Sequence, residues 1–180
     1  MHLPGLGPIF AALLAAATAG CGTYRWTPDV PEDMRTVAVP EFMNETDVPG
    51  LGAAVTRHTL REFQREGTFG IRRSGSAAVE VQGVLKKADR TPMTYDRNYG
   101  MRASEYRMAV YAEVSLVDKA SGTVLANNRR YKAETTFMSG RDLLTGRANA
   151  MDRLAGDLAR QIVDDVRNLD WTRPDAPASK

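Results

Sequence analysis

The stretch that decides the fold is Glu105-Tyr-Arg-Met-Ala-Val-Tyr-Ala-Glu-Val-Ser-Leu-Val-Asp118. One set of alternate positions is apolar throughout and consists of Tyr106, Met108, Val110, Ala112, Val114 and Leu116. The other set includes Arg107, Tyr111, Glu113 and Ser115. Because successive side chains of a β-strand point to opposite faces of the sheet, the stretch predicts a long strand with one buried and one wet face. Such alternation is typical of antiparallel sheets.

The segments around this strand supply its partners. Lys119-Ala-Ser-Gly122 predicts a tight turn, because glycine adopts backbone angles that other residues avoid. Thr123–Phe137 then returns as the hairpin partner. Two further strands are predicted at Arg35–Phe42 and Ala78–Lys87, and the second of these places Val79, Val81 and Leu85 on one face. Between them and the central strand, Ala88–Ala103 contains Pro92 and Gly100 and predicts a long, mobile connection.

Two stretches carry apolar residues at spacings of three and four, which predicts amphipathic helices. The first spans Gly50–Glu66 and stops at Gly67. Its apolar positions are Leu51, Ala54, Val55, Leu60 and Phe63. The second spans about Arg141 to Leu169, and its apolar positions are Leu144, Ala148, Met151, Ala155, Leu158, Ile162, Val166 and Leu169.

The predicted order of elements is therefore strand, helix, strand, strand, strand, helix. Two helices with one apolar face each and a sheet with one apolar face bury one another directly when both helices lie on the same side. The sequence predicts an α+β fold, a two-layer sandwich in which two helices pack on one face of a four-stranded mixed sheet.

Cys21 is the only cysteine, and it follows an apolar run of small residues that ends in Ala19-Gly20. This arrangement is typical of a bacterial lipoprotein signal, in which a peptidase cleaves before the cysteine and the thiol receives lipid. The alternative is a structural cysteine buried in an N-terminal helix. Residues 1–4 lack Lys and Arg, and Thr18 stands where such signals more often have Leu, so the boundary of the signal depends on the true start codon.

Cleavage before Cys21 leaves 160 residues (180 minus 20), enough for one domain with a core of its own. We expect residues 1–20 to be a signal peptide, 21–34 a lipidated tether, 35–171 a single α+β domain and 172–180 a disordered tail. The apolar run Ile9–Ala19 is shorter than the roughly 20 residues that span a bilayer. Attachment is therefore expected through acyl chains alone.

The composition argues against several classes of function. With 24 basic and 22 acidic side chains, the chain lacks the basic excess typical of nucleic-acid binding. With Cys21 acylated and only His2 and His58 as histidines, no metal site and no cofactor are expected. His58 has no acid or nucleophile at a telling spacing, and no pair of carboxylates is singled out, so we expect no enzyme activity.

Basic residues are the remaining candidates for a binding site. Arg97 and Arg102 lie in the predicted long connection, and Arg129, Arg130 and Lys132 lie on the hairpin partner of the central strand. Guanidinium groups bind phosphate through paired hydrogen bonds, so these side chains suit a phosphorylated glycolipid. The alternative is protection of an exposed sheet edge, where Lys and Arg prevent aggregation.

Several stretches, taken in order, resemble the LPS-assembly lipoprotein family LptE. They are Cys21-Gly-Thr-Tyr-Arg-Trp26, Met34-Arg-Thr-Val-Ala-Val-Pro-Glu-Phe-Met-Asn-Glu-Thr46, Pro49-Gly-Leu51, Leu60-Arg-Glu-Phe63, Thr94-Tyr-Asp96, Glu105-Tyr-Arg107 and Leu116-Val-Asp-Lys-Ala-Ser-Gly-Thr-Val-Leu125. The resemblance spans nearly all of the chain after Cys21, and the family fold agrees with the order of elements derived above.

The resemblance implies a lipoprotein anchored in the outer membrane and facing the periplasm, where it plugs the β-barrel LptD and assists its assembly. It also implies a part in delivering lipopolysaccharide to the outer leaflet, with basic residues on or beside the sheet as contacts. In this sequence those are Arg97, Arg102, Arg129, Arg130 and Lys132. The alternative function is a free-standing envelope lipoprotein with a structural role or another ligand.

Overall fold

The computed structural model describes residues 30–96, 102–138 and 143–171. Cys21, the predicted signal peptide and the predicted tail lie outside these ranges, so those predictions stay predictions. The described elements are η1 (Glu32–Met34), β1 (Thr36–Ala38), β2 (Met43–Asn44), α2 (Leu51–Glu66), β3 (Gly70–Ile71), β4 (Val79–Asp96), β5 (Arg102–Asp118), β6 (Val124–Met138) and α3 (Leu143–Arg167).

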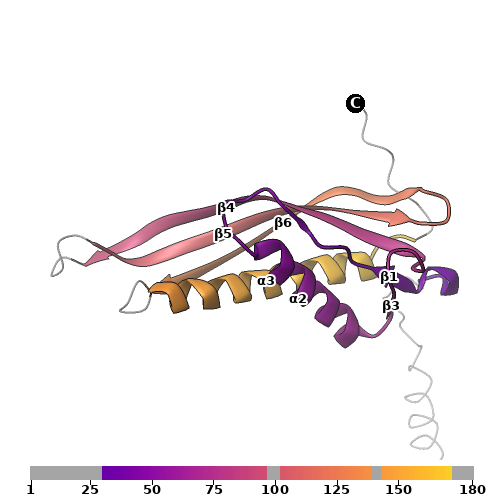
Figure 1. Cartoon of the computed structure of the whole chain (residues 1–180), viewed down its shortest axis with the longest axis horizontal. Helices are drawn as coiled ribbons and strands as arrows, with labels where there is room; N and C mark the ends of the chain where they lie inside the picture. The colour runs from indigo at the N-terminus through magenta and orange to yellow at the C-terminus, as the bar shows by residue number, and fades with distance from the viewer. Residues whose placement is uncertain (1–29, 97–101, 139–142, 172–180) are drawn as a thin grey trace, which may run out of the picture.

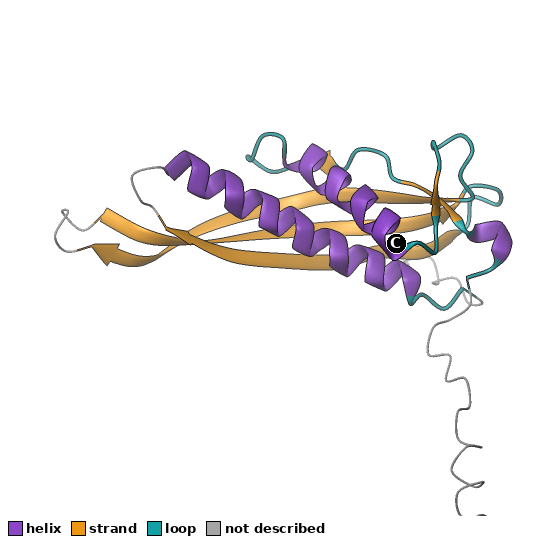
Figure 2. Ribbon diagram, turned by 90° about the horizontal axis from the view of Figure 1, so that it is seen from below, coloured by secondary structure: helices purple, strands orange, loops and turns teal. Residues whose placement is uncertain are grey.

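The sheet and the two helices form two layers, as predicted. The strand order is β3-β1-β4-β5-β6, with β2 also paired to β4, and the long strands β4, β5 and β6 are antiparallel neighbours. β1 and β2 run parallel to β4, which makes the sheet mixed. Both helices cover the same face (Figure 1, Figure 2). The described residues form six strands rather than the predicted four, because β2 and β3 are two-residue strands that carry no period-two signal.

The buried face of β5 is the one predicted from its alternation. Met108, Val110, Ala112, Val114 and Leu116 are all buried, and Tyr106 packs against the same core. In register opposite them, Val81 and Leu85 of β4 pair with Leu116 and Ala112. The core therefore lies between the inner face of the three long strands and the two helices.

The helices bury most positions of the predicted stripes, but Ala148 is exposed, Met151 is half-buried, and Leu144 and Leu60 also depart from the prediction. Leu51, Ala54, Val55 and Phe63 of α2 are buried, and Gly67 ends the helix with a left-handed φ of 82°. On α3, Ala155, Leu158, Ile162 and Val166 are buried, whereas Leu144 is 79% exposed because the first turn lies beyond the core. Leu60 of α2, also predicted in the core, is only half-buried.

The prediction of a long connection over Ala88–Ala103 is wrong. β4 continues to Asp96 and β5 begins at Arg102, so the hairpin ladder runs as far as the Asp96–Arg102 pair. Pro92 favoured the prediction of a connection because proline cannot donate a hydrogen bond within a β-sheet. Leu85 is the last β4 residue that pairs with β2. Beyond it, β5 is the only described partner of β4, so Pro92 lies on a sheet edge, where a missing N–H donor is tolerated.

The β5–β6 turn has the predicted form. Gly122 has a φ of 72°, and its N–H donates to the Asp118 carbonyl at 2.9 Å. The Asp118 carboxylate accepts from the Ser121 hydroxyl and from the backbone N–H of Ala120. These hydrogen bonds lower the pKa of Asp118, the one from Ser121 contributing most.

The molecule is elongated, and its two ends differ. At one end, which we call the near end, β1, β3 and η1 lie together and the described chain begins at Val30, which is buried (Figure 1). At the other end, which we call the distal end, β4 and β5 project past the helices (Figure 2). No described helix combines the length and the apolar character needed to cross a membrane.

At Gly83 the backbone of β4 lies very close to the ring of Phe42. A Cβ at this position would lie 2.1 Å from the ring of Phe42, whose side chain is buried against β4. Only glycine therefore lets Phe42 pack flat on the sheet.

We predict that Gly83→Ala lowers the free energy of unfolding by about 1–3 kcal/mol, because the added methyl group overpacks the Phe42 site. Urea denaturation followed by circular dichroism measures this. Gly75→Ala is the matched control, since no atom lies within 4 Å of a Cβ there. Equal midpoints for the two variants would contradict the packing argument.

Candidate functional site

The described residues hold no group of three or more His, Cys, Asp or Glu that could bind a metal ion. His58 instead fastens the two helices together: its Nε2 lies 2.7 Å from Oδ1 of Asp152 on α3. Gly156 of α3 lies beside the same ring, where a Cβ would make an ordinary contact at 3.4 Å. The hydrogen bond from His58 lowers the pKa of Asp152. His58 thus has a structural partner rather than a nucleophile.

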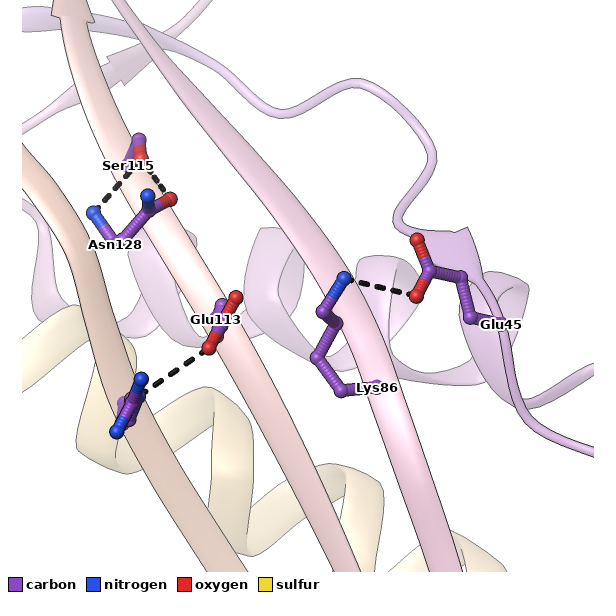
Figure 3. A network of polar contacts seen from close by, with 6 residues as sticks. Glu45, Lys86, Glu113, Ser115 and Asn128 are labelled. Atoms are coloured by element: carbon purple, nitrogen blue, oxygen red, sulfur yellow. Dashed lines mark hydrogen bonds and ion pairs between the residues drawn. The ribbon is translucent and has the colours of Figure 1, made fainter. Parts of the chain in front are cut away.

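The face of the sheet that the helices leave open carries charges that pair with one another. Lys86 points toward Glu45 (Figure 3), and its Nζ lies 2.8 Å from a Glu45 carboxylate oxygen. Nε of Arg130 lies 3.3 Å from a Glu113 carboxylate oxygen. Farther along, Lys87 pairs with Asp89 and Lys132 with Glu134, both at 2.8 Å. The hydrogen bond between Lys132 and Glu134 raises the pKa of the lysine and lowers that of the glutamate.

Tyr111 lies in the middle of this open face. Its ring is flanked by Lys87 at 6.0 Å and Lys132 at 5.7 Å from the ring centroid. Both distances suit a weak attraction between an ammonium group and the face of an aromatic ring. The open face therefore presents a polar surface whose positive and negative groups largely neutralise one another.

The structure separates the predicted basic residues. Arg130 and Lys132 lie on the open face, but Arg129 points to the helices. Its Nη1 lies 2.8 and 2.9 Å from the two carboxylate oxygens of Asp165 on α3. Tyr131 donates to the same carboxylate, and burial, together with that contact, raises the pKa of Tyr131.

A β-bulge decides which arginine faces the helices. Leu116 pairs with Ala126, but Val114 pairs with Arg129, so β6 contains one extra residue between these pairs. Asn128 absorbs it with a left-handed φ of 45°, and its N–H donates to the Ser115 hydroxyl at 3.0 Å (Figure 3). Without the extra residue, Arg129 would stand opposite Glu113 on the open face.

Arg102 lies apart from the other predicted residues, at the distal end. It is exposed and opens β5 in register with Asp96. No side chain that the structure describes forms an ion pair with Arg102, and the side chain of Asp96 is not among those described. Arg97 falls outside the described residues, as does Cys21. The structure therefore places the four described candidates in three locations.

The distal end also exposes large apolar side chains, which the sequence did not single out. They are Met93 (42% exposed), Tyr95 (51%), Met138 (68%) and Leu144 (79%), from β4, β6 and α3. Just inside them, Tyr106 and Phe137 stack with ring centroids 5.6 Å apart, and the Arg90 guanidinium lies 5.2 Å from the Tyr106 ring. We call Arg102 and these four apolar residues the distal patch. It joins a cation to apolar surface, which suits an amphiphilic anion.

Comparisons with known proteins bear on the fold and the family. A family model described as LptE, lipopolysaccharide-assembly, matches residues 34–166. No curated protein sequence matches this chain. Among solved structures, protein XCC0632 from Xanthomonas campestris has a TM-score of 0.56 at 12% identity and covers 79% of this chain and 87% of its own.

Two further structures are similar. Protein CT253 from Chlamydia trachomatis has a TM-score of 0.53 at 11% identity, covering 77% of this chain and 98% of its own. A minor lipoprotein from Acinetobacter baumannii has a TM-score of 0.50 at 10% identity, covering 74% of this chain and 93% of its own. At these identities the likeness concerns the fold alone.

The two consecutive arginines of β6 should differ in their effect on stability. We predict that Arg129→Ala lowers the free energy of unfolding by about 1.5–3 kcal/mol, because it leaves a half-buried Asp165 without its charged donor. Arg130→Ala should change it by less than about 0.5 kcal/mol, since the Arg130 side chain is 86% exposed. Chemical denaturation of both variants measures the difference. Equal losses would contradict the placement on opposite faces.

Proposed function

The chain belongs to the LptE lipopolysaccharide-assembly family, and on that premise we propose that it is an outer-membrane lipoprotein that plugs the β-barrel LptD. In this role it assists assembly of the barrel and helps to deliver lipopolysaccharide to the outer leaflet. The observation that carries the proposal is the family match over residues 34–166, which includes both helices almost entirely and every strand.

The open face of the sheet supports the position inside a barrel. The interior of an outer-membrane barrel is polar and holds water. A surface whose Lys, Arg, Asp and Glu are already paired can lie against such a wall without leaving a charge uncompensated. An apolar face would suit the same wall poorly, and here the helices cover the apolar face.

The length of the domain supports the same position. β4 has 18 residues, which at about 3.3 Å per residue extend about 60 Å. The apolar band of an outer-membrane barrel is about 25 Å tall. A plug that enters from the periplasm with its long strands along the barrel axis therefore brings the distal end deep into the lumen, while the near end stays beside the anchored leaflet.

The distal patch is the best-placed surface for lipopolysaccharide. Lipid A combines phosphates with acyl chains, and the patch combines Arg102 with Met93, Tyr95, Met138 and Leu144. Of the other described candidates, Arg129 is held by Asp165, and Arg130 and Lys132 each pair with a glutamate. Binding there requires that an existing ion pair be replaced, so we place the first contact at Arg102.

Affinity purification tests the barrel partnership. The tagged lipoprotein, extracted from outer membranes in mild detergent, should bring down one large barrel protein in near-equal amount. Depletion of the lipoprotein should reduce both the folded barrel and the lipopolysaccharide at the cell surface. If no barrel protein is recovered and surface lipopolysaccharide stays normal, the proposal fails and a free-standing envelope lipoprotein is the better description.

A charge reversal tests the distal patch. We predict that Arg102→Glu weakens binding of fluorescent lipopolysaccharide to the purified protein by about tenfold, since a charge-assisted hydrogen bond to phosphate is replaced by repulsion. Arg160→Glu is the matched control, because this α3 arginine lies outside the patch, where its partner is Asp157 of the same helix. Equal affinities of the two variants would place the glycolipid elsewhere.

A further inference from the structure

Leu60 departs from the buried stripe of α2 and lies between two grooves on the surface of the helix layer. One groove, of about 660 Å³, is lined by Leu60, Val39 and Ile71 together with Arg72 and Arg73. The other, of about 380 Å³, is lined by Leu60, Ala53 and Thr56 together with Arg57 and Arg61. Leu60 lines both grooves, and each groove combines apolar side chains with two arginines.

The four arginines form no ion pair within the described part of the chain. Their neighbours on α2 behave differently, since Arg65 pairs with Glu62 and Glu66 pairs with Arg167. Arg61 lies 3.4 Å from the His58 ring, and Arg72 donates to the Ile71 carbonyl. In addition to the hydrogen bond from His58, the charges of Arg61 and Arg57 help to lower the pKa of Asp152, without forming an ion pair with it. Glu41 is the single carboxylate among the residues lining the two grooves. We call Leu60 with Arg57, Arg61, Arg72 and Arg73 the proximal patch.

The proximal patch lies at the end of the molecule where the described chain begins. The Arg72 N–H donates to the Val37 carbonyl at 2.9 Å, which fixes β3 beside β1. The Arg35 Nε in turn donates to the Val30 carbonyl at 3.0 Å. Cys21 precedes Val30 by nine residues (30 minus 21), which span at most about 30 Å when fully extended.

We propose that the proximal patch docks on the anionic phospholipid headgroups of the leaflet that holds the acyl anchor. This inference rests on the lipidation of Cys21 in the proposed function. Guanidinium groups bind phosphate through paired hydrogen bonds, and the apolar side chains around Leu60 accommodate the upper part of a lipid. A tether this short keeps the patch within reach of the bilayer. Contact at this second point then fixes the orientation of the domain and directs the distal end away from the anchored leaflet.

Energy transfer to labelled lipid tests the proposal on the lipoprotein purified from membranes. A fluorescent donor is attached at Gln64→Cys, beside the patch, and the protein is reconstituted into vesicles that carry an acceptor on a headgroup. The vesicles contain phosphatidylethanolamine with either phosphatidylglycerol or phosphatidylcholine. We expect about twofold higher transfer in the phosphatidylglycerol vesicles, falling as salt rises from about 50 to 300 mM because the contact is screened.

Arginine variants identify the groups responsible. Arg57→Gln/Arg61→Gln and Arg72→Gln/Arg73→Gln should each reduce the difference between the two kinds of vesicle, and the four changes together should abolish it. The control variant Arg147→Gln/Arg160→Gln removes an equal number of charges, two, from α3. It should keep the difference in energy transfer between the two kinds of vesicle. Thermal unfolding of each variant shows that it is folded.

The outcomes separate this inference from the proposed anchor. Protein that floats with neither kind of vesicle lacks an acyl anchor, which overturns the lipidation and the docking proposal that rests on it. Protein that floats with both but shows equal transfer is anchored without docking, which overturns the proposal alone. If the arginine variants keep the lipid response and instead lose the barrel protein in affinity purification, the patch serves a protein partner and the proposal is wrong.

Discussion

The structure depends on burial of one face of β5 beneath two helices. Met108, Val110, Ala112, Val114 and Leu116 occupy that face, and both neighbouring strands are held in register against it. A shift of one residue would turn every one of these side chains to water. The same constraint sets the position of the helices, because their apolar stripes have no other surface of comparable size to cover.

The opposite face of the sheet follows from the same alternation. Many of the positions that do not face the core carry Lys, Arg, Asp or Glu, and these pair within a strand, as Lys87 with Asp89 and Lys132 with Glu134, or across strands, as Arg130 with Glu113. The two layers also differ in length: α3 has 25 residues, which at about 1.5 Å each extend about 38 Å, well short of β4. The sheet consequently projects beyond the helices at the distal end.

Polar links across the layers complete the packing. His58 of α2 bonds to Asp152 of α3, and Asp165 of α3 holds both Arg129 and Tyr131 of β6. The linked residues are at least 34 positions apart in the chain, so no local spacing reveals these links. The bulge at Asn128 has the same character: it is a single extra residue in one strand, and it sends Arg129 to the helices while Arg130 stays on the open face.

The sequence by itself determined the two-layer α+β fold, the buried face of β5 and of β4 up to Leu85, both helices and the Gly122 turn, because periodicity and glycine conformation are local properties. It did not reveal β2 and β3, which are too short to show a period, or the pairing of residues 88–96, where Pro92 is read as a break. The role of the predicted basic residues as ligand contacts stays a prediction, and only the tertiary structure decided where each described one lies. Arg102 is exposed, Arg129 is held by Asp165, and the four arginines around Leu60 come together only because β3 folds back beside α2.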